Sequence, residues 1–161
     1  MSQKYAEEIK GLITRTGKQI QDMDEDVLKA KPAPNKWSKI EILGHLIDSA
    51  YNNHQRFARA WDKDDLNFEG YAQDNWVRKN NYQERDVQEV LHLFIASNNH
   101  IAHLISQLDS ELMHKTTTSH NFDKIGMRPV AKGASTNLAF LIEDYIFHMK
   151  HHLKQILDID C

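Results

Sequence analysis

Apolar residues recur at three- and four-residue steps in four separate segments of this chain, which is the spacing that gathers side chains on one face of an α-helix. The sequence has only 6 Gly and 3 Pro in 161 residues, and its β-branched residues do not cluster into alternating runs. Both features favour helix over sheet. The first helix is expected over residues 3–23, with an apolar stripe of Tyr5, Ile9, Leu12, Ile13 and Ile20.

A capping box marks the start of the second expected helix. The hydroxyl of Ser38 can accept a hydrogen bond from the N–H of Glu41, while the Glu41 carboxylate reaches back to the Ser38 N–H. Two prolines keep residues 31–36 out of any helix, so this segment is a linker. The second helix is expected to end near residue 62.

Two further helices follow, each after a long connection. The third helix is expected from Asp86 with a stripe ending at Leu108, and the fourth from Ser135 or Thr136. The connection over residues 63–85 is rich in aromatic residues and is expected to be a loop that packs over one end of the helices; residues 111–134 have room for a short hairpin. Four amphipathic helices predict an all-α fold, a four-helix bundle with long connecting loops, as a single domain over residues 1–161.

Charge and hydropathy exclude several classes of protein. The formal net charge of −3 and a pI near 6.3 argue against a nucleic-acid partner, which would require clustered Lys and Arg. No stretch approaches 18 apolar residues, so no membrane span is expected, and the N-terminus lacks the features of a signal peptide. We therefore expect a cytoplasmic protein. The single cysteine, Cys161, cannot form an internal disulfide.

Three of the 10 histidines indicate a metal site. His148 and His152 are four residues apart, which places their Cβ atoms about 5–6 Å apart on one helix face. Both fall on the stripe expected to face inward, where neutral imidazoles need polar partners, and a cation with a water ligand would supply them. His45 lies on an inward stripe of the second helix and is the best third ligand. His151 can compete with His152, because it is also about one turn from His148.

The same residues also allow other interpretations. A lone histidine on an apolar stripe is more often a hydrogen-bonded core residue than a ligand. Asp48 and Glu41 lie about one turn after and before His45, and either can orient its ring or act as general base. Tyr71 and Trp76 are candidates to line a pocket. The remaining histidines are interpreted as surface or packing residues: His54, His92, His100, His103, His114 and His120.

Three motifs of the sequence resemble those of the DinB/YfiT-like family, over about residues 30–157. The N-terminal motif of the family is similar to Trp37-Ser38-x-x-Glu41-Ile42-Leu43-Gly44-His45-Leu46-x-Asp48. Its middle loop is similar to Tyr71-x-Gln73-Asp74-x-Trp76-Val77, followed by Tyr82, and its C-terminal motif to His148-x-x-His151-His152-x-x-Gln155-Ile156. The two histidine motifs together are more specific than either alone.

The resemblance implies a four-helix bundle in which three histidines, here His45, His148 and His152, hold a divalent metal ion. Zinc or nickel is expected first and iron next. The family implies a frequent homodimer and a small-molecule substrate, with activity as a metal-dependent hydrolase or as an S-transferase of a low-molecular-weight thiol such as bacillithiol or mycothiol. The sequence contains no Gly-x-Ser-x-Gly motif and no internal cysteine as an alternative nucleophile. The alternative function is a non-catalytic, stress-related metal-binding or scaffold bundle.

Overall fold

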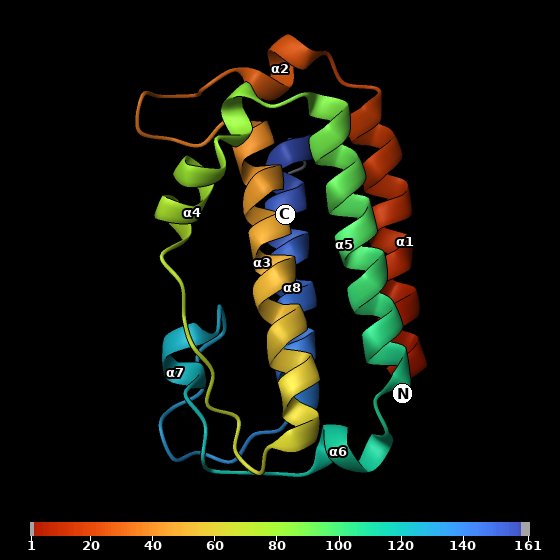
Figure 1. The fold of residues 1–161 in the computed structure, drawn as a ribbon, viewed down its shortest axis with the longest axis vertical. Coiled ribbons are helices and arrows are strands. Elements are labelled where there is room, and N and C mark those ends of the chain that lie inside the picture. The colour runs from red at the N-terminus through yellow and green to blue at the C-terminus, as the bar shows by residue number, and fades with distance from the viewer. Residues whose placement is uncertain (1, 159–161) are drawn as a thin grey trace.

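The structure is a computed structural model that describes residues 2–158, and within that range it contains helices and no strand. Cys161 lies outside the described residues. Four long helices form a bundle (Figure 1), which confirms the predicted all-α architecture. Their bounds are Ser2–Gln21 for α1, Lys39–Arg59 for α3, Val87–Gln107 for α5 and Leu138–Leu157 for α8.

The bundle does not follow a simple up-and-down path. Each long helix packs against two others, in the cyclic order α1, α5, α3, α8. Figure 1 shows that α1 and α8 run upward in the view while α3 and α5 run downward, so α3 and α5 are parallel. Parallel neighbours need a connection that returns along the bundle, and residues 60–86 provide it.

That connection differs from the predicted loop. It contains a helix of eight residues, α4 (Gln73–Asn80), and two 3₁₀ turns, η1 (Ala60–Asp62) and η2 (Tyr82–Glu84). The expectation that it packs over one end of the bundle is wrong, because α4 lies against the side of α3 and buries Val77 there. The reason is topological, since the chain must travel the length of α3 before α5 can begin.

The second long connection also contains short helices, α6 (Ser110–His114) and α7 (Phe122–Ile125). The suggested hairpin is reduced to one antiparallel bridge between Thr117 and Thr136. Because Thr136 is used in this bridge, α8 begins at Leu138, after the predicted start, with Asn137 accepting from the Phe140 N–H as its N-cap. A further short helix, α2 (Glu25–Lys29), precedes the linker and was not predicted.

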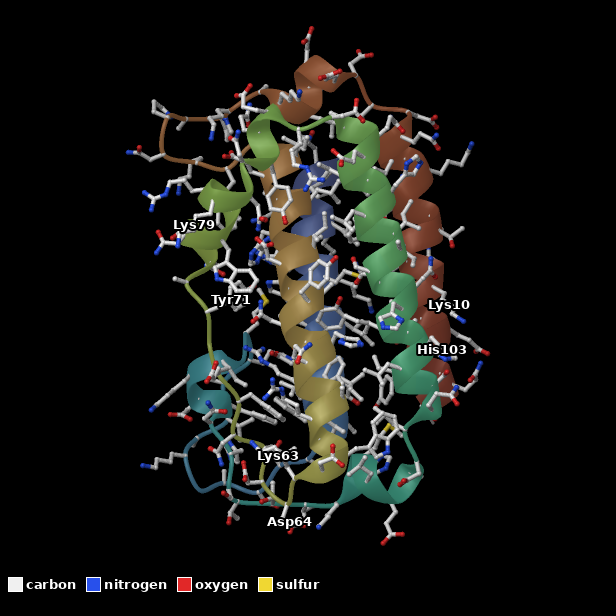
Figure 2. The ribbon with its side chains drawn as sticks, viewed as in Figure 1. Lys10, Lys63, Asp64, Tyr71, Lys79 and His103 are labelled. Atoms are coloured by element: carbon white, nitrogen blue, oxygen red, sulfur yellow. The ribbon has the colours of Figure 1, made fainter. Side chains whose placement is uncertain are left out.

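The predicted apolar stripes of the four long helices form most of the core, and buried residues of the connections, such as Phe68 and Phe122, extend it. Phe57, Phe94 and Phe122 are its largest fully buried side chains. Figure 2 shows the labelled charged residues Lys10 and Lys79 at the periphery. The capping box at the start of α3 is present as predicted. None of the helices within residues 2–158 combines the length and the apolar character needed to cross a membrane.

Candidate metal centre

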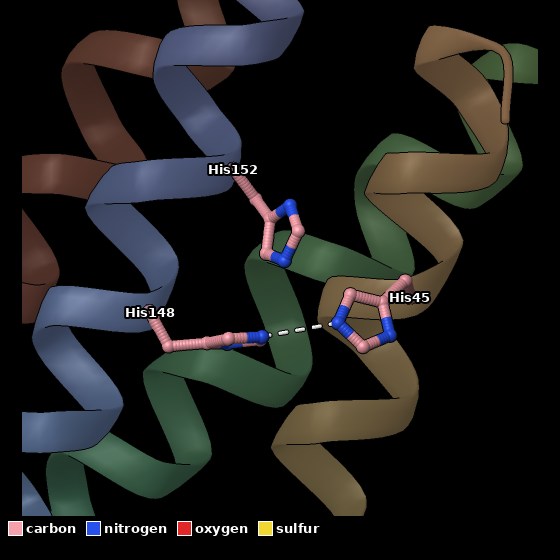
Figure 3. A group of neighbouring side chains, drawn as sticks. All are labelled: His45, His148 and His152. Carbon is pink, nitrogen blue, oxygen red and sulfur yellow. Dashed lines mark hydrogen bonds between the residues drawn. The ribbon is translucent and has the colours of Figure 1, made fainter. Parts of the chain in front are cut away.

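Three imidazoles from two neighbouring helices meet inside the bundle. His45 comes from the second turn of α3, while His148 and His152 come from successive turns of α8, which runs antiparallel to α3 (Figure 3). One nitrogen from each ring lies within 4.8 Å of the nitrogens of the other two. The closest pair is His45 Nε2 and His148 Nε2, which are 3.0 Å apart. Helical spacing and antiparallel packing together therefore bring the three predicted ligands to one point.

Neighbouring side chains orient two of the rings. Nδ1 of His152 donates to Gln155 Oε1 at 2.7 Å, which leaves its Nε2 as the atom with a free lone pair. Nδ1 of His148 lies 3.5 Å from Ser49 Oγ, at the limit of a hydrogen bond. Nδ1 of His45 is buried and has no hydrogen-bond partner within residues 2–158. In all three histidines, Nδ1 is thus the ring nitrogen that is turned away from the point where the rings meet.

Burial keeps these imidazoles neutral. The side chain of His45 is only 1% exposed, and desolvation together with the nearby His152 lowers its pKa to about 4. Desolvation also lowers the pKa of His148, with further contributions from His152 and His45, and desolvation lowers that of His152. A neutral imidazole is the form that binds a metal ion, so the cluster presents its ligands without a proton to displace near neutral pH.

The donor set fits a divalent cation. Zinc bound by nitrogen at about 2.0–2.1 Å in a tetrahedral site requires its ligand atoms to be roughly 3.3 Å apart. The distance of 3.0 Å between the Nε2 atoms of His45 and His148 is close to that value, and a nitrogen of His152 lies within 4.8 Å of the nitrogens of the other two rings. Three imidazoles also suit nickel and iron, so the geometry is compatible with each metal that the sequence suggested.

His151, the alternative ligand, does not belong to the converging group in the part of the chain that the structure describes. Its side chain is exposed, and its ring centroid lies 5.0 Å from that of His152. The offset of about 100° between successive helical residues accounts for this position.

Asp48 and Glu41 occupy very different environments. Asp48 is 2% exposed, and its Oδ1 accepts from the hydroxyl of Tyr82 at 2.7 Å and from Asn80 Nδ2 at 3.0 Å. Its Oδ2 is buried and has no partner in the described range, and desolvation raises the pKa of this carboxyl to about 6. Neither carboxylate has a hydrogen bond to His45 within residues 2–158.

The carboxylate of Glu41 is bound at the start of α3. Its Oε2 accepts from the backbone N–H of Ser38 at 2.8 Å and from Lys31 Nζ at 2.6 Å. These contacts complete the capping box and tie the linker to the helix.

A cavity of about 810 Å³ opens beside the histidines, between α3, α8 and the connection that contains Tyr71. His148 and His152 lie in its wall together with Ser49, Tyr71 and Arg56. Burial raises the pKa of Tyr71 to about 12, so its hydroxyl remains protonated near neutral pH. The ring of Trp76 is tilted against that of Tyr71, with centroids 5.1 Å apart, but Trp76 is 38% exposed and is not among the residues that line this cavity.

A second cavity of about 900 Å³ shares Gln73, Asp74 and His152 with the first. It extends over the linker side of α3, where Trp37 lies 4.9 Å from the ring of His45. The two cavities therefore adjoin each other at His152, one member of the histidine cluster.

Two residues of the site were not singled out from the sequence as functional candidates. Gln155 lies three residues after His152 and was visible only as part of the C-terminal motif. Arg56 follows Ser49 and Asn53 at seven and three residues, on the same face of α3. A charged residue that continues an inward stripe is the signal by which Arg56 could have been found.

Comparisons with known proteins agree with this geometry. Proteins named "putative metal-dependent hydrolase" from Bacillus cereus strain B4264 and Bacillus thuringiensis subsp. konkukian strain 97-27 are each 23% identical over 159 residues, 99% of this chain and 85% of theirs. A Bacillus mycoides strain KBAB4 protein of the same name is 22% identical over 156 residues, covering 97% of this chain and 83% of its own.

The solved structure of YfiT from Bacillus subtilis has the same fold. It superposes with a TM-score of 0.77 at 16% identity and covers 98% of this chain and 85% of its own. YfiT is described as a probable metal-dependent hydrolase with an unusual four-helix bundle topology. At that identity the likeness establishes the fold. The family model of the DinB superfamily matches residues 10–156, which include all three histidines of the cluster, and the chain therefore belongs to the DinB superfamily.

Proposed function

We propose that this protein is a metal-dependent enzyme in which His45, His148 and His152 bind a divalent cation, zinc or nickel first and iron next. The observation that carries the proposal is the convergence of three neutral imidazoles, of which His148 and His152 lie in the wall of a cavity large enough for a small molecule. The names of the Bacillus relatives support the choice of a hydrolase.

When bound, the cation would supply Lewis acidity, which lowers the pKa of water or of a thiol toward neutrality. Two reactions use this chemistry: hydrolysis of a small-molecule substrate and transfer of a low-molecular-weight thiol to an electrophile. Tyr71, with a protonated hydroxyl in the cavity wall, can donate a hydrogen bond to the substrate. The two cavities that meet at His152 leave space for a second reactant, which thiol transfer requires.

We assign Asp48 a positioning role and Glu41 a structural one. Asp48 lines neither cavity, so its carboxylate cannot reach a substrate and acts through its neighbours. His45 Nδ1 and Asp48 Oδ2 are both buried and unpartnered in the described chain, about one helical turn apart. A ligating histidine commonly donates its outer N–H to a carboxylate, and Asp48 is the candidate for that bond. Glu41 stabilises the start of α3.

Metal content tests the proposal directly. The purified protein, after reconstitution with zinc or nickel, is expected to hold about one equivalent of metal per chain, and His148→Ala far less, because one of three ligands is removed. If the native and the reconstituted protein both hold less than about a tenth of an equivalent, the enzyme proposal fails and the non-catalytic bundle stands.

Activity assays then separate the two reactions. The metal-loaded protein is incubated with ester and amide substrates alone, and with a low-molecular-weight thiol plus chlorinated or epoxide electrophiles. Turnover that depends on both the thiol and the metal identifies an S-transferase, whereas turnover without a thiol identifies a hydrolase. We also propose, from the family resemblance, a cytoplasmic homodimer, which sedimentation and cell fractionation would test.

A further inference from the structure

A buried arginine without a counterion lies in the wall of the cavity beside the histidine cluster. Arg56, near the end of α3, is 7% exposed and lines this cavity. Its Nη1 donates to Asn53 Oδ1 at 3.3 Å and its Nη2 to the carbonyl oxygen of Glu69 at 3.1 Å. Its Nε is buried and has no partner, and no carboxylate forms an ion pair with Arg56 within residues 2–158.

Such an arrangement is costly unless an anion is bound. A guanidinium remains charged in proteins even where, as here, burial lowers its pKa. Taking that charge out of water without a partner is strongly unfavourable, and buried charges in folded proteins are normally paired. Two neutral oxygen acceptors satisfy only part of the five N–H donors of Arg56.

The acidic residue of the cavity wall that acts electrostatically on Arg56 is already neutralised. This residue is Asp144, whose charge raises the pKa of the guanidinium. Its two oxygens accept from the backbone N–H groups of Met127 and Arg128 at 2.8 Å, and Oδ1 also accepts from Arg128 Nε at 3.2 Å. Since Arg128 balances the charge of Asp144, this wall retains the positive charge of Arg56.

Arg56 lines the same cavity as His148 and His152 but lies at a distance from them. Ser49 contacts His148, and Arg56 lies seven residues further along α3, about 10 Å along the helix axis. Both residues line the same cavity, so one elongated small molecule can contact Arg56 while its other end lies at the histidine cluster.

We propose that Arg56 binds a carboxylate of the small-molecule substrate, at the end of the molecule away from the histidines. That the bound molecule is a substrate rests on the proposed function, whereas the binding of an anion by Arg56 does not depend on the metal. Nε and an adjacent terminal nitrogen of a guanidinium form the planar fork that matches a carboxylate. Each carboxylate group of a ligand carries one negative charge, which balances the single unpaired positive charge of Arg56, whereas a phosphate group carries close to two.

The test is an NMR titration of the zinc-loaded protein at constant ionic strength, with sodium succinate as the probe. The Nε–H resonance of Arg56 is identified by its loss in Arg56→Lys, and the backbone amide of Gly126, which also lines the cavity, serves as a second reporter. We expect succinate to shift both resonances saturably, and the uncharged analogue succinamide to leave them unchanged. Inorganic phosphate is expected to bind at least tenfold more weakly than succinate.

Two variants test whether Arg56 is the anchor. Arg56→Gln is expected to weaken succinate binding, read at Gly126, by at least tenfold, and Arg56→Lys by a similar factor because an ammonium lacks the planar fork. Lys124→Gln is the matched control, since Lys124 also lines the cavity but is exposed. The affinity of Lys124→Gln for succinate is expected to stay within about twofold of the native value, because solvent screens the charge of an exposed lysine.

The outcomes are distinct from those of the metal proposal. No saturable shift of the Arg56 resonance, equal weakening by the Lys124 and Arg56 substitutions, or phosphate binding as tight as succinate each overturns the carboxylate site. Metal content is measured on the same samples. Zinc bound with no response to succinate would leave the proposed function intact. A response to succinate in a protein that holds less than about a tenth of an equivalent of metal, both as purified and after reconstitution with zinc or nickel, would reject the proposed function and retain the anion site. If Arg56→Gln does not fold, the succinate affinity of Arg56→Lys and the shift of the Arg56 resonance in the native protein still test the carboxylate site.

Discussion

The ring of Tyr82 packs directly against the backbone of Gly44, in the space that a side chain at position 44 would fill. A Cβ atom on Gly44 would lie 2.1 Å from Cδ2 and 2.2 Å from Cγ of Tyr82. This close approach brings the Tyr82 hydroxyl to Asp48 Oδ1 at 2.7 Å. Because Gly44 precedes His45, the connection between α3 and α5 is held against the turn of α3 that carries the first candidate ligand.

Gly44→Ala is therefore expected to destabilise the protein by about 1–3 kcal/mol, the usual cost of adding a methyl group to a filled core. The clash is with a buried aromatic ring, so it cannot be relieved by moving a flexible chain end. Denaturant unfolding of the metal-free protein measures the effect. Gly11→Ala in α1 is the control, because its Cβ would meet only Arg15 Nη1 at 3.3 Å, and it should gain up to about 1 kcal/mol from helix propensity. Equal stability changes for the two variants would contradict this packing.

The buried carboxyl of Asp48 predicts a pH-dependent effect on stability. Its pKa is raised from 3.8 to about 6 by desolvation, so the folded state binds a proton more tightly than the unfolded state. The stabilisation by the protonated form is fully present below pH 3.8 and is lost as the pH rises through about 6. Asp48→Asn is uncharged at every pH and can keep the acceptor for Tyr82 and Asn80.

We therefore expect the Tm of Asp48→Asn minus that of the native protein to increase between pH 4 and 6 and to level off above pH 6. Thermal unfolding with chelator in both samples measures this difference without a contribution from bound metal. A difference that stays constant across this range, or decreases, would show that the carboxyl titrates at its ordinary pKa. The same variant should bind zinc more weakly if Asp48 orients His45.

Local periodicity accounts for what the sequence predicted correctly. His148 and His152 share a helix face by spacing alone, and the stripes of apolar residues identified the four long helices and their inward faces. The convergence of His45 with this pair also depends on how far α3 and α8 are shifted along their axes relative to each other. Periodicity cannot predict this shift, because many different shifts bury the same apolar stripes. The family resemblance predicted it instead.

The residues that periodicity could not place are those positioned by tertiary contacts. Helix α4 has only Val77 as a buried residue, which is too little apolar pattern to distinguish a helix from a loop. The position of the Tyr82 ring depends on the space left by the missing side chain of Gly44, and nothing in the sequence around either residue predicts their contact. The start of α8 was missed because the bridge between Thr117 and Thr136 competes with helix formation there.

Removing one ligand at a time should distinguish His152 from His151. His152 belongs to the converging group, whereas His151 is exposed beside it. A ligand that binds only the folded state raises the Tm, so zinc should raise the Tm of the native protein and of His151→Ala. His152→Ala is expected to lose most of that increase. If His151→Ala loses the zinc effect and His152→Ala keeps it, then the alternative ligand set is correct.

Gln155 is expected to affect metal binding without affecting stability. Its Oε1 accepts from His152 Nδ1 at 2.7 Å, and its side chain is otherwise exposed. Loss of a partner that orients a ligating imidazole typically weakens metal affinity by about 10–100-fold, while exposed substitutions change stability by about 0.5 kcal/mol or less. Gln155→Ala should therefore bind zinc about 10–100-fold more weakly in a chelator competition at unchanged unfolding free energy without metal. Gln155→Glu keeps an acceptor oxygen at this position and should restore the affinity. Equal zinc affinity of Gln155→Ala and the native protein would mean that the ring of His152 is held by its own helix and the cation alone.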